Sequence, residues 1–355
     1  MTSGSAAPQR IALLYGGPSS EHDVSVKSAV SAGKALRAAG FDVHPVYVDR
    51  EGRWHLRPPT ADINLSAPAP ASECVSFDQA LGILKALDPV CCFLGFHGTF
   101  GEDGRVQAAL ELSGLRYTGS GPLASGLAMD KVMARRIYRS VGLPVAPAIE
   151  LDSAALQAAG GAASAAERIV ASVGVPCVGK VAAGGSSVGV EIVRQREDLE
   201  ATLLRLSAMW PTVLVERFIA GTELTCGVLR LNGEEVALPP VEIAPKPGRF
   251  FDYEVKYDPS LVEEICPARI SPEATTELQR LAVAAHHALG CRGVSRTDAI
   301  LDADGAIWLL ETNTLPGLTP ASLLPKAAAG AGMAYSDLML HILAGSGVEV
   351  HAPSP

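Results

Sequence analysis

The segment RTDAILDADGAIWLLETNTLPGLTPAS, residues 296–322, is the most informative part of this chain. Its DADG stretch at 302–305 predicts a tight turn. The apolar run at 306–310 that follows predicts a strand. The turn folds this strand back beside the residues that precede it, so we expect a hairpin here.

Polar side chains converge on one face of this expected hairpin. Glu311 and Asn313 are two residues apart, so on a strand they point to the same face. The turn brings Asp298 beside them, with Arg296 next to it. Two carboxylates and one amide oxygen suit Mg²⁺, which usually acts together with nucleotide phosphates. The alternative is a hairpin with solvated acids, but an apolar strand leading into ETN at a Gly/Pro-rich loop is unusual for a surface hairpin.

Composition restricts the classes of protein to which the chain can belong. With 355 residues, 48% of them hydrophobic and 19% charged, we expect a packed protein of two or three domains. The net charge of −9 argues against general nucleic-acid binding. No stretch resembles a membrane span or a secretory signal. The seven cysteines lack metal-ligand spacing and indicate free thiols in a reducing cytosol.

The first third of the chain alternates between strand-like and helix-like segments. These are a strand at 11–15, a helix at 23–39, and strands at 41–48 and 89–96. Such alternation predicts a doubly wound parallel sheet, whose ligands gather at the carboxyl ends of the strands. The loop at 16–21 and His97 therefore belong on the ligand-facing edge. Residues 57–73, rich in Pro, Ala and Ser, predict a surface loop.

The middle of the chain begins at a boundary near residues 119–122. We expect a helix after it that carries Met129, Asp130 and Lys131. Residues 153–167 are rich in alanine, which favours a helix.

A glycine-rich loop, GGSSVG at 184–189, follows an apolar strand at 175–181 that contains Lys180. Glycines let the backbone N–H groups approach a phosphate closely. A tight hairpin turn would not need a lysine within the apolar strand, so we favour a phosphate loop. The nearly matching P-loop pattern that ends at Lys180 is rejected, because Val181 stands where a Ser or Thr should hold Mg²⁺.

Two further segments give weaker signals. In TVLVERFIAGTE (212–223), a strand ends in the acid Glu216 and is followed by the apolar pair Phe218 and Ile219, an arrangement that could hold adenine. Glu223 could then accept hydrogen bonds from the ribose hydroxyls. FDYEVKY (251–257) is either a loop that closes over a site or an ordinary loop. Glu21 lies at the start of the first helix, where the helix dipole favours an acid, so from this segment alone capping is the better explanation for it.

Taken together, the chain resembles the D-alanine–D-alanine ligase family of the ATP-grasp superfamily from about residue 11 to its last helix. The matching segments are GGPSSEHDVS (16–25), FHGTFGEDG (96–104), YTGSG (117–121), MDK (129–131), GGSSVG (184–189), VERFIAGTE (215–223), FDYEVKY (251–257), CPA (266–268), RTDAIL (296–301) and ETNTLPGLTPASL (311–323). Their number and order make the resemblance specific.

The resemblance implies an α/β ATP-grasp fold: an N-terminal doubly wound domain (1–120), a central ATP-grasp subdomain (121–215) and a C-terminal ATP-grasp and metal or substrate domain (216–355). The last two would be α+β and would enclose ATP. It also implies a reaction in which ATP phosphorylates the carboxylate of one D-alanine. The amine of a second D-alanine then attacks the acyl phosphate, and a tetrahedral intermediate collapses to D-alanyl-D-alanine for peptidoglycan synthesis.

The resemblance assigns roles residue by residue. Two Mg²⁺ (or Mn²⁺) would be held by Asp298, Glu311 and Asn313. ATP would be held by Lys131, Lys180, Ser186, Ser187, Glu216, Phe218, Ile219, Glu223 and Lys256. The substrates would be held by Glu21, His97, Arg296, Gly317, Ser322 and Leu323. Glu21, Ser186 and Tyr257 would form a hydrogen-bonded link between loops, and Arg296 would stabilise the acyl phosphate and the oxyanion.

The resemblance further implies a cytoplasmic homodimer acting on small molecules. The pair Lys256 and Tyr257 favours an amine as the second nucleophile, since relatives that use D-lactate lack it. Two alternatives remain. One is a ligase that joins D-alanine to another D-amino acid or D-hydroxy acid. The other is a nucleotide-binding regulator without turnover, against which the set of Arg296, Asp298, Glu311 and Asn313 argues.

Overall fold

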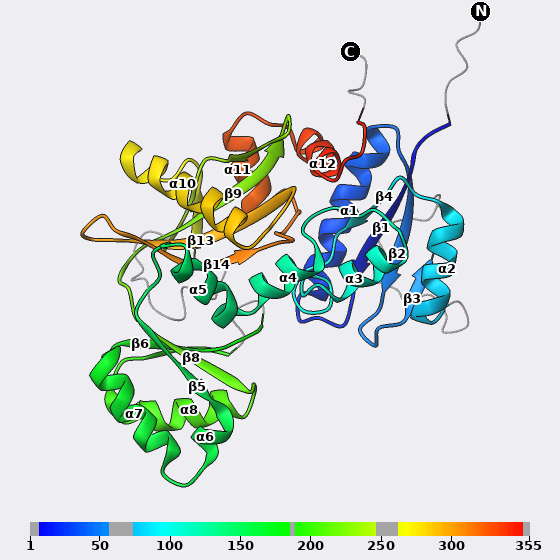
Figure 1. The fold of residues 1–355 in the computed structure, drawn as a ribbon. Helices are drawn as coiled ribbons and strands as arrows, with labels where there is room; N and C mark the ends of the chain where they lie inside the picture. Colours follow the sequence, from blue (N-terminus) through cyan, green and yellow to red (C-terminus); the bar gives the residue numbers. More distant parts are fainter. Residues whose placement is uncertain (1–6, 57–73, 185–188, 246–261, 351–355) are drawn as a thin grey trace, which may run out of the picture.

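The computed structural model describes residues 7–56, 74–184, 189–245 and 262–350. The expected loop at 57–73 lies outside the described residues, as do four candidate site residues: Ser186, Ser187, Lys256 and Tyr257. The described residues form three sheets with helices packed around them (Figure 1).

The first sheet has the strand order β3-β2-β1-β4. β1 (Arg10–Gly16) pairs in parallel with β2 (Asp42–Val48) and β4 (Cys91–Leu94), whereas β3 (Trp54–Leu56) is an antiparallel edge strand. Its helices are α1 (His22–Ala38), α2 (Phe77–Leu87) and α3 (Arg105–Leu112). Neighbouring residues of β1 point to opposite faces, so Leu13 clusters with residues of α1 and Leu14 with residues of α2 and α3. The predicted doubly wound sheet is confirmed.

The loops after β1 and β4 lie side by side at the carboxyl ends of these strands. The chain turns at Gly16, where φ is +90° and a Cβ would lie 2.1 Å from the carbonyl oxygen of Val48. The hydroxyl of Ser25, on α1, accepts the Gly16 N–H and donates to the Gly95 carbonyl, both at 2.7 Å. Helix α1 therefore ties the two loops together.

The central sheet is antiparallel throughout, with the order β5-β8-β6-β7. Its strands are β5 (Ala148–Asp152), β6 (Cys177–Val181), β7 (Val190–Val193) and β8 (Thr212–Arg217). One face is covered by α6 (Ser153–Gln157), α7 (Gly161–Ser172) and α8 (Leu199–Ser207), with a 3-10 turn at Arg196–Asp198 before α8 (Figure 1). The Ala-rich segment at 153–167 spans two helices, because Gly160, with a φ of +73°, interrupts it.

The expectation of one helix through Met129, Asp130 and Lys131 is wrong. α4 (Pro122–Met129) ends at Met129, and α5 (Lys131–Ser140) begins at Lys131. Asp130 between them is extended, and its side chain accepts the N–H groups of the first turn of α5. Asp130 also pairs with Ala183 in an isolated bridge, and the Lys131 N–H donates to the Ala182 carbonyl at 2.7 Å. These contacts to the central sheet favour a helix break, with the aspartate as the cap of the second helix.

The third sheet has the order β12-β11-β9-β13-β14, with β10 beside β9, and all its pairs are antiparallel. Its strands are β9 (Gly221–Leu231), β10 (Glu234–Ala237), β11 (Val241–Pro245), β12 (Val262–Ile265), β13 (Val294–Asp302) and β14 (Ile307–Asn313). The helices that pack around it are α10 (Pro272–Ala288), α11 (Leu323–Gly330) and α12 (Tyr335–Ala344), and α4 and α5 pack on β14.

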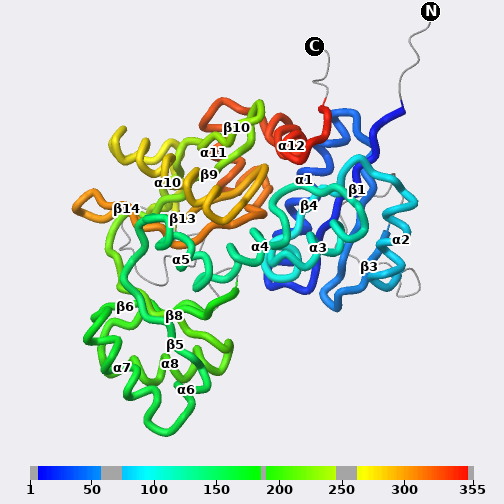
Figure 2. The backbone as a smooth tube through the Cα atoms, viewed as in Figure 1, coloured from blue at the N-terminus to red at the C-terminus, as the bar shows by residue number. Residues whose placement is uncertain are grey.

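The apolar cores connect two of the three sheets. One cluster joins Ile11 and Leu36 of the first sheet's layers with Leu229 and Leu338 from β9 and α12. The central sheet has a separate main cluster, formed by its own strands and helices, and a small cluster of Val132, Ala182 and Leu214 joins it to α5. The tube in Figure 2 shows this arrangement, with the central sheet set apart from the other two.

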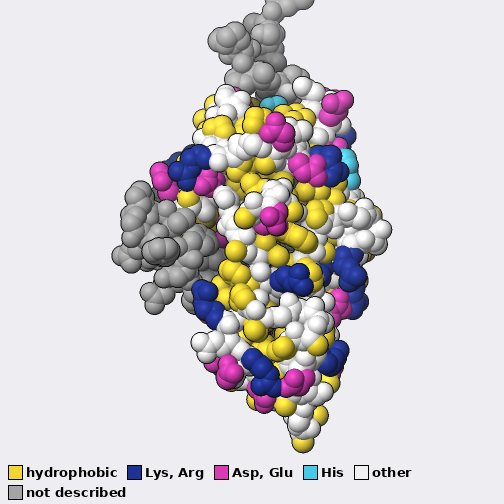
Figure 3. Space-filling model, turned by 90° about the vertical axis from the view of Figure 1, so that its left-hand side faces the viewer, with side chains coloured by type: hydrophobic (Ala, Val, Ile, Leu, Met, Phe, Trp, Pro, Cys, Tyr) yellow, Lys and Arg dark blue, Asp and Glu magenta, His cyan; other side chains and the backbone are white. Residues whose placement is uncertain are grey.

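Two surface findings bear on partners. Within the described ranges, no helix is both long enough and apolar enough to cross a membrane. On the face shown in Figure 3, the described Lys and Arg side chains are interspersed with Asp and Glu and form no continuous basic surface. This face therefore lacks the charge pattern that binds nucleic acid.

Candidate active site

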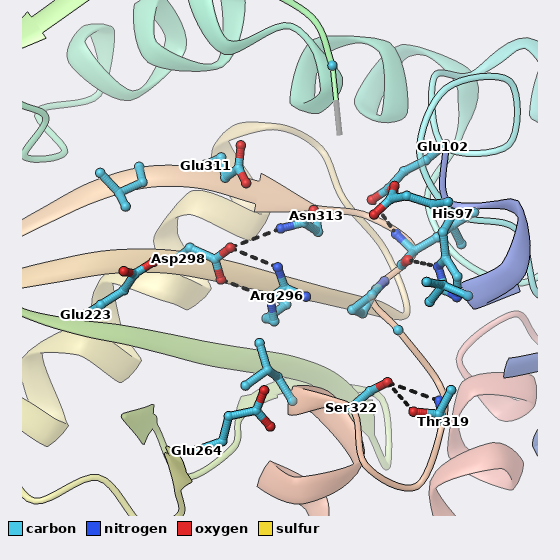
Figure 4. A pocket seen from close by; sticks show the side chains of 18 of the residues that line it. His97, Glu102, Glu223, Glu264, Arg296, Asp298, Glu311, Asn313, Thr319 and Ser322 are labelled. Carbon is cyan, nitrogen blue, oxygen red and sulfur yellow. Dashed lines mark hydrogen bonds and ion pairs between the residues drawn. The ribbon is translucent and has the colours of Figure 1, made fainter. Parts of the chain in front are cut away.

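A cavity of about 620 Å³ lies where the three sheets meet. Its lining from the first sheet's loops is Glu21, Val24, His97 and Glu102; from α5 and the central sheet, Lys131, Lys180, Gly184 and Val190; and from the third sheet and its loops, Glu223, Glu264, Arg296, Asp298, Leu310, Glu311, Asn313, Leu315, Pro316, Gly317, Thr319, Ala321, Ser322 and Leu323. Figure 4 shows that many of these side chains are acids or their hydrogen-bond partners. The cavity thus collects most of the described residues that the sequence analysis selected.

The β13–β14 hairpin forms as predicted. The Asp302 side chain accepts N–H groups from Asp304 and Ala306 at 3.0 and 2.8 Å, which closes the turn. In the register, Asp298 lies opposite Glu311, with an irregularity after Asp298. This pairing places both carboxylates at one end of the hairpin.

Arg296 and Asp298 form a bidentate ion pair in the cavity wall. The arginine Nε and Nη2 donate to the two carboxylate oxygens at 2.9 and 2.8 Å. The hydroxyl of Thr225 donates to the same carboxylate at 2.6 Å, and the Asn313 amide nitrogen lies 3.4 Å away. Burial lowers the pKa of Arg296, but the adjacent Asp298 outweighs it, so the net shift is upward and the guanidinium stays charged. The Asp298 side chain is therefore held in place by partners on three strands.

Glu311 has its own cation. Its Oε2 lies 2.9 Å from the Nζ of Lys131, which also donates to the Gly184 carbonyl at 2.9 Å. Burial raises the pKa of the Glu311 carboxyl, but Lys131, with Lys180 and Arg296 behind it, brings the net shift well below the usual range. For Lys131 itself, burial opposes the charge, and Glu311 reverses that effect, so its pKa is raised. The pair is thus fully ionised at neutral pH.

The metal candidates Asp298, Glu311 and Asn313 fit Mg²⁺ only in part. They supply two carboxylates and an amide near one another, which are hard oxygen ligands. Among the described residues, no group of three His, Cys, Asp or Glu side chains is placed to hold a metal ion. In addition, Asn313 turns its amide nitrogen toward Asp298, so a metal would require the amide to rotate. The site fits an ion that takes its remaining ligands from phosphate and water.

The nucleotide candidates are distributed around the cavity. Lys131, Lys180 and Glu223 line it. Glu216 is almost fully buried, and its carboxylate lies 2.5 Å from Lys180 Nζ and 3.1 Å from Arg135 Nη1. The structure therefore places Glu216 as an anchor for Lys180. Phe218 and Ile219 follow β8 and are half-buried, outside the lining of this cavity.

Glu21, His97, Gly317 and Ser322 lie at the substrate end. No capping hydrogen bond comes from the Glu21 side chain, and a Cβ on Gly98 would lie 2.4 Å from its Oε2. The Ser322 hydroxyl accepts the Thr319 N–H at 3.2 Å and lies 2.7 Å from the Thr319 hydroxyl (Figure 4). Leu323, the first residue of α11, also lines the cavity. Glu21 therefore lies at the N-cap of α1 without a side-chain capping hydrogen bond.

Glu102 and Arg135 could not be singled out from the sequence. Glu102 is 7% exposed, and burial raises the pKa of its carboxyl to about 7. The sequence indication for Glu102 is its place in the segment FHGTFGEDG, which also contains His97. Arg135 is one of three arginines on α5 (KVMARRIYRS), and the sequence does not distinguish it from the other two.

The chain matches known proteins over nearly its whole length. Residues 10–120 match the family described as D-ala D-ala ligase N-terminus, and residues 137–344 match D-ala D-ala ligase C-terminus. It is 41% identical to a D-alanine–D-alanine ligase of Desulforudis audaxviator, over 94% of this chain and 97% of that protein. It is 38% identical to a D-alanine–D-alanine ligase of Bordetella petrii, over 97% and 94%.

Two solved structures of related ligases share the fold of this chain. The D-alanine-D-alanine ligase from Coxiella burnetii superposes with a TM-score of 0.78 at 25% identity, covering 96% of this chain and 94% of that one. The VanG D-Ala:D-Ser ligase from Enterococcus faecalis superposes with a TM-score of 0.81 at 30% identity, covering 96% and 99%. The arrangement of the three sheets is therefore shared with both.

Proposed function

This chain belongs to the D-alanine–D-alanine ligase family, and we propose on that premise that it joins two D-alanines to D-alanyl-D-alanine with ATP. A carboxylate oxygen of the first D-alanine attacks the γ-phosphorus and ADP leaves. The amine of the second D-alanine attacks the acyl carbon, and phosphate leaves from the tetrahedral intermediate. The observation that carries the proposal is the convergence of Arg296, Asp298, Glu311, Lys131 and Lys180 on one cavity.

The charges of the cavity suit both steps. Negative charge develops on phosphoryl oxygens in the first step and on an acyl oxygen in the second, and oriented cations stabilise such charge. Arg296 is fixed in orientation by its two bonds to Asp298, so its remaining N–H groups are preorganised for an oxyanion. We propose that Arg296 serves this role and that Lys131 and Lys180 hold phosphates.

We propose that ATP lies between the central and third sheets. Lys131, Lys180 and Glu223 would contact it, with Glu216 fixing Lys180 from behind. Roles for Phe218, Ile219, Ser186, Ser187 and Lys256 rest on the family resemblance. Two Mg²⁺ or Mn²⁺, held by Asp298, Glu311 and Asn313, would neutralise phosphate oxygens when bound. Because Lys131 and Arg296 neutralise these carboxylates in the structure, we expect the metal to bind together with the nucleotide.

We propose that the two amino acids occupy the opposite end. Glu21 would pair with the ammonium of the first D-alanine beside His97. Gly317, through its backbone N–H, with Ser322 and Leu323, would hold the carboxylate of the second. The position of Ser322 at the N-cap of α11 supports this, because a helix N-terminus favours an anion. The link through Ser186 and Tyr257 rests on the resemblance alone.

The wider context follows from the same proposal. The product would feed peptidoglycan synthesis in the cytoplasm, and we propose a homodimer. We also keep the division into units at 1–120, 121–215 and 216–355 as a proposal, which the three separate sheets support.

The test is phosphate release with ATP, Mg²⁺ and D-alanine, with the product identified by mass spectrometry. D-serine, D-lactate and L-alanine are run as competing acceptors. Phosphate that depends on D-alanine, with the mass of the D-alanyl-D-alanine product, is the expected result. A preferred mass with D-serine or D-lactate would move the chain to the specificity of a paralogous ligase. Nucleotide binding without phosphate release would contradict the enzyme assignment.

A further inference from the structure

The loop at residues 315–318, which we call the acceptor loop, is held by hydrogen bonds at both of its ends. It follows β14 and contains Gly317, whose N–H is proposed above to bind the second substrate. Both backbone groups of Leu315 form hydrogen bonds: its N–H donates to Glu102 Oε1 at 3.0 Å, and its carbonyl lies 2.8 Å from His97 Nδ1. Both partners come from the segment that follows β4 in the first sheet.

The backbone of Leu318, at the other end of the loop, forms two hydrogen bonds in the same way. The Leu318 N–H donates to the Ser28 hydroxyl on α1 at 3.2 Å, and its carbonyl accepts from the Tyr335 hydroxyl on α12 at 2.6 Å. Pro316 has no N–H, so Gly317 provides the N–H group between the two fixed residues. Leu315 and Leu318 are also buried in the apolar clusters of the first sheet. The loop is therefore held by side chains and backbone contacts at both ends.

The direction of each hydrogen bond follows from the chemistry of the groups. A carbonyl only accepts, so the proton of His97 is on Nδ1. Nε2 is then an acceptor and takes the hydroxyl proton of Ser28, 2.8 Å away. With its proton given to His97, Ser28 accepts the Leu318 N–H. Both ring nitrogens of His97 are thus used within the protein, and the imidazole is neutral, which agrees with a pKa lowered by burial.

Glu102 completes the connection. Its second oxygen, Oε2, accepts the N–H of Gly98 at 3.1 Å, the residue after His97. One carboxylate therefore joins the loop that follows β4 to the acceptor loop. Ser28, His97 and Glu102 are all 7% exposed or less, so these bonds are shielded from water.

We propose that Ser28, His97 and Glu102 are positioning residues that hold the acceptor loop so that the Gly317 N–H faces the carboxylate of the second substrate. The first sheet then contributes to the acceptor site without touching the acceptor. The proposal rests on the proposed function, because it assigns the acceptor to this loop. It predicts a defect in acceptor binding that is separate from the binding of ATP and of the first D-alanine.

Ser28→Ala is the first test, with Ser25→Ala as the matched control. Both serines are fully buried on α1, and each joins two groups by hydrogen bonds, but the partners of Ser25 are Gly16 and Gly95 rather than the acceptor loop. The dependence of rate on D-alanine resolves the two substrate sites. We expect Ser28→Ala to raise the KM of the acceptor site about tenfold, the equivalent of about 1.4 kcal/mol, with the KM for ATP unchanged. The control should lose a similar amount of thermal stability without this selective rise.

Amide hydrogen exchange of the ligand-free wild type gives an independent test that needs no activity. The proposal predicts slow exchange at the Leu315 and Leu318 amides, and faster exchange at Leu318 in Ser28→Ala. Fast exchange at both amides in the wild type would overturn it. Glu102→Gln is the second variant, which is used if Ser28→Ala does not fold. An acceptor KM within twofold of wild type in both variants would also overturn the proposal. If the wild type makes no dipeptide, the proposed function fails, and the exchange experiment still decides whether the loop is held.

Discussion

Replacing Arg296 by Met should slow turnover and tighten metal binding, which are opposite effects on two functions of one cavity. Methionine keeps much of the apolar stem and removes the guanidinium. Asp298 then loses two hydrogen bonds, at 2.9 and 2.8 Å, and keeps the hydroxyl of Thr225 at 2.6 Å. The carboxylate therefore remains in place while its resident cation is gone.

The two magnitudes follow from the geometry. Removing one preorganised donor from a developing oxyanion lowers turnover about 100- to 1,000-fold, or about 3–4 kcal/mol. Two unit charges 4 Å apart at an effective dielectric constant of 20 interact by about 4 kcal/mol. Even after screening, loss of the Arg296 charge beside Asp298 should tighten binding of Mn²⁺ to the nucleotide-free protein by about tenfold or more.

The assays separate these effects. Phosphate release at saturating ATP and D-alanine gives turnover, calorimetry gives ATP affinity, and electron paramagnetic resonance of free Mn²⁺ gives metal affinity. Arg269→Met is the control, because Arg269 forms an equally bidentate pair with Glu242 outside the cavity lining. Turnover within about threefold of wild type in Arg296→Met, or weaker Mn²⁺ binding, would refute the reasoning.

Three further predictions concern the cavity wall. Burial raises the pKa of Glu102 from 4.5 to about 7, so the folded protein keeps a proton that the unfolded chain releases. Relative to Glu102→Gln, the wild type should therefore lose up to about 3 kcal/mol of stability as pH rises from about 4.5 to 7. Parallel Tm curves of the two proteins across that range would contradict this. Lys131→Met removes the cation that lowers the pKa of Glu311. As pH falls, Mn²⁺ binding should therefore be lost at a higher pH than in wild type. An unchanged acid limb of the binding curve would contradict this role of Lys131. In Gly317→Ala the new Cβ would lie 2.9 Å from the Ser322 hydroxyl and displace it, so the acceptor KM should rise several-fold; an equal rise in the KM of both D-alanine sites would argue against that assignment.

The local part of the fold and the site could be predicted from the sequence. The turn at DADG has an aspartate whose side chain can close it, and apolar residues on both sides fix the hairpin, so the meeting of Asp298 and Glu311 follows from neighbouring residues alone. The parallel first sheet could likewise be predicted from the alternation of segments.

Contacts between distant segments could not be predicted. Glu102 and Leu315 are 213 residues apart, and no local pattern indicates that one carboxylate accepts N–H groups from two loops. The position of Glu216 at the end of an apolar strand likewise does not reveal that Arg135 and Lys180 pair with its carboxylate. The helix break at Asp130 was missed for the same reason, since it depends on a bridge to Ala183.

The distribution of apolar cores has a consequence for how the molecule comes apart. Residues of β1 and α1 share a cluster with β9 and α12, whereas the central sheet and its helices have a cluster of their own. Segments that share a core melt together, and a segment with its own core can open alone. We therefore expect two cooperative unfolding units instead of three. The first and third sheets, with the amino-acid end of the cavity between them, would form one unit, and the central sheet would be free to open and close as the other.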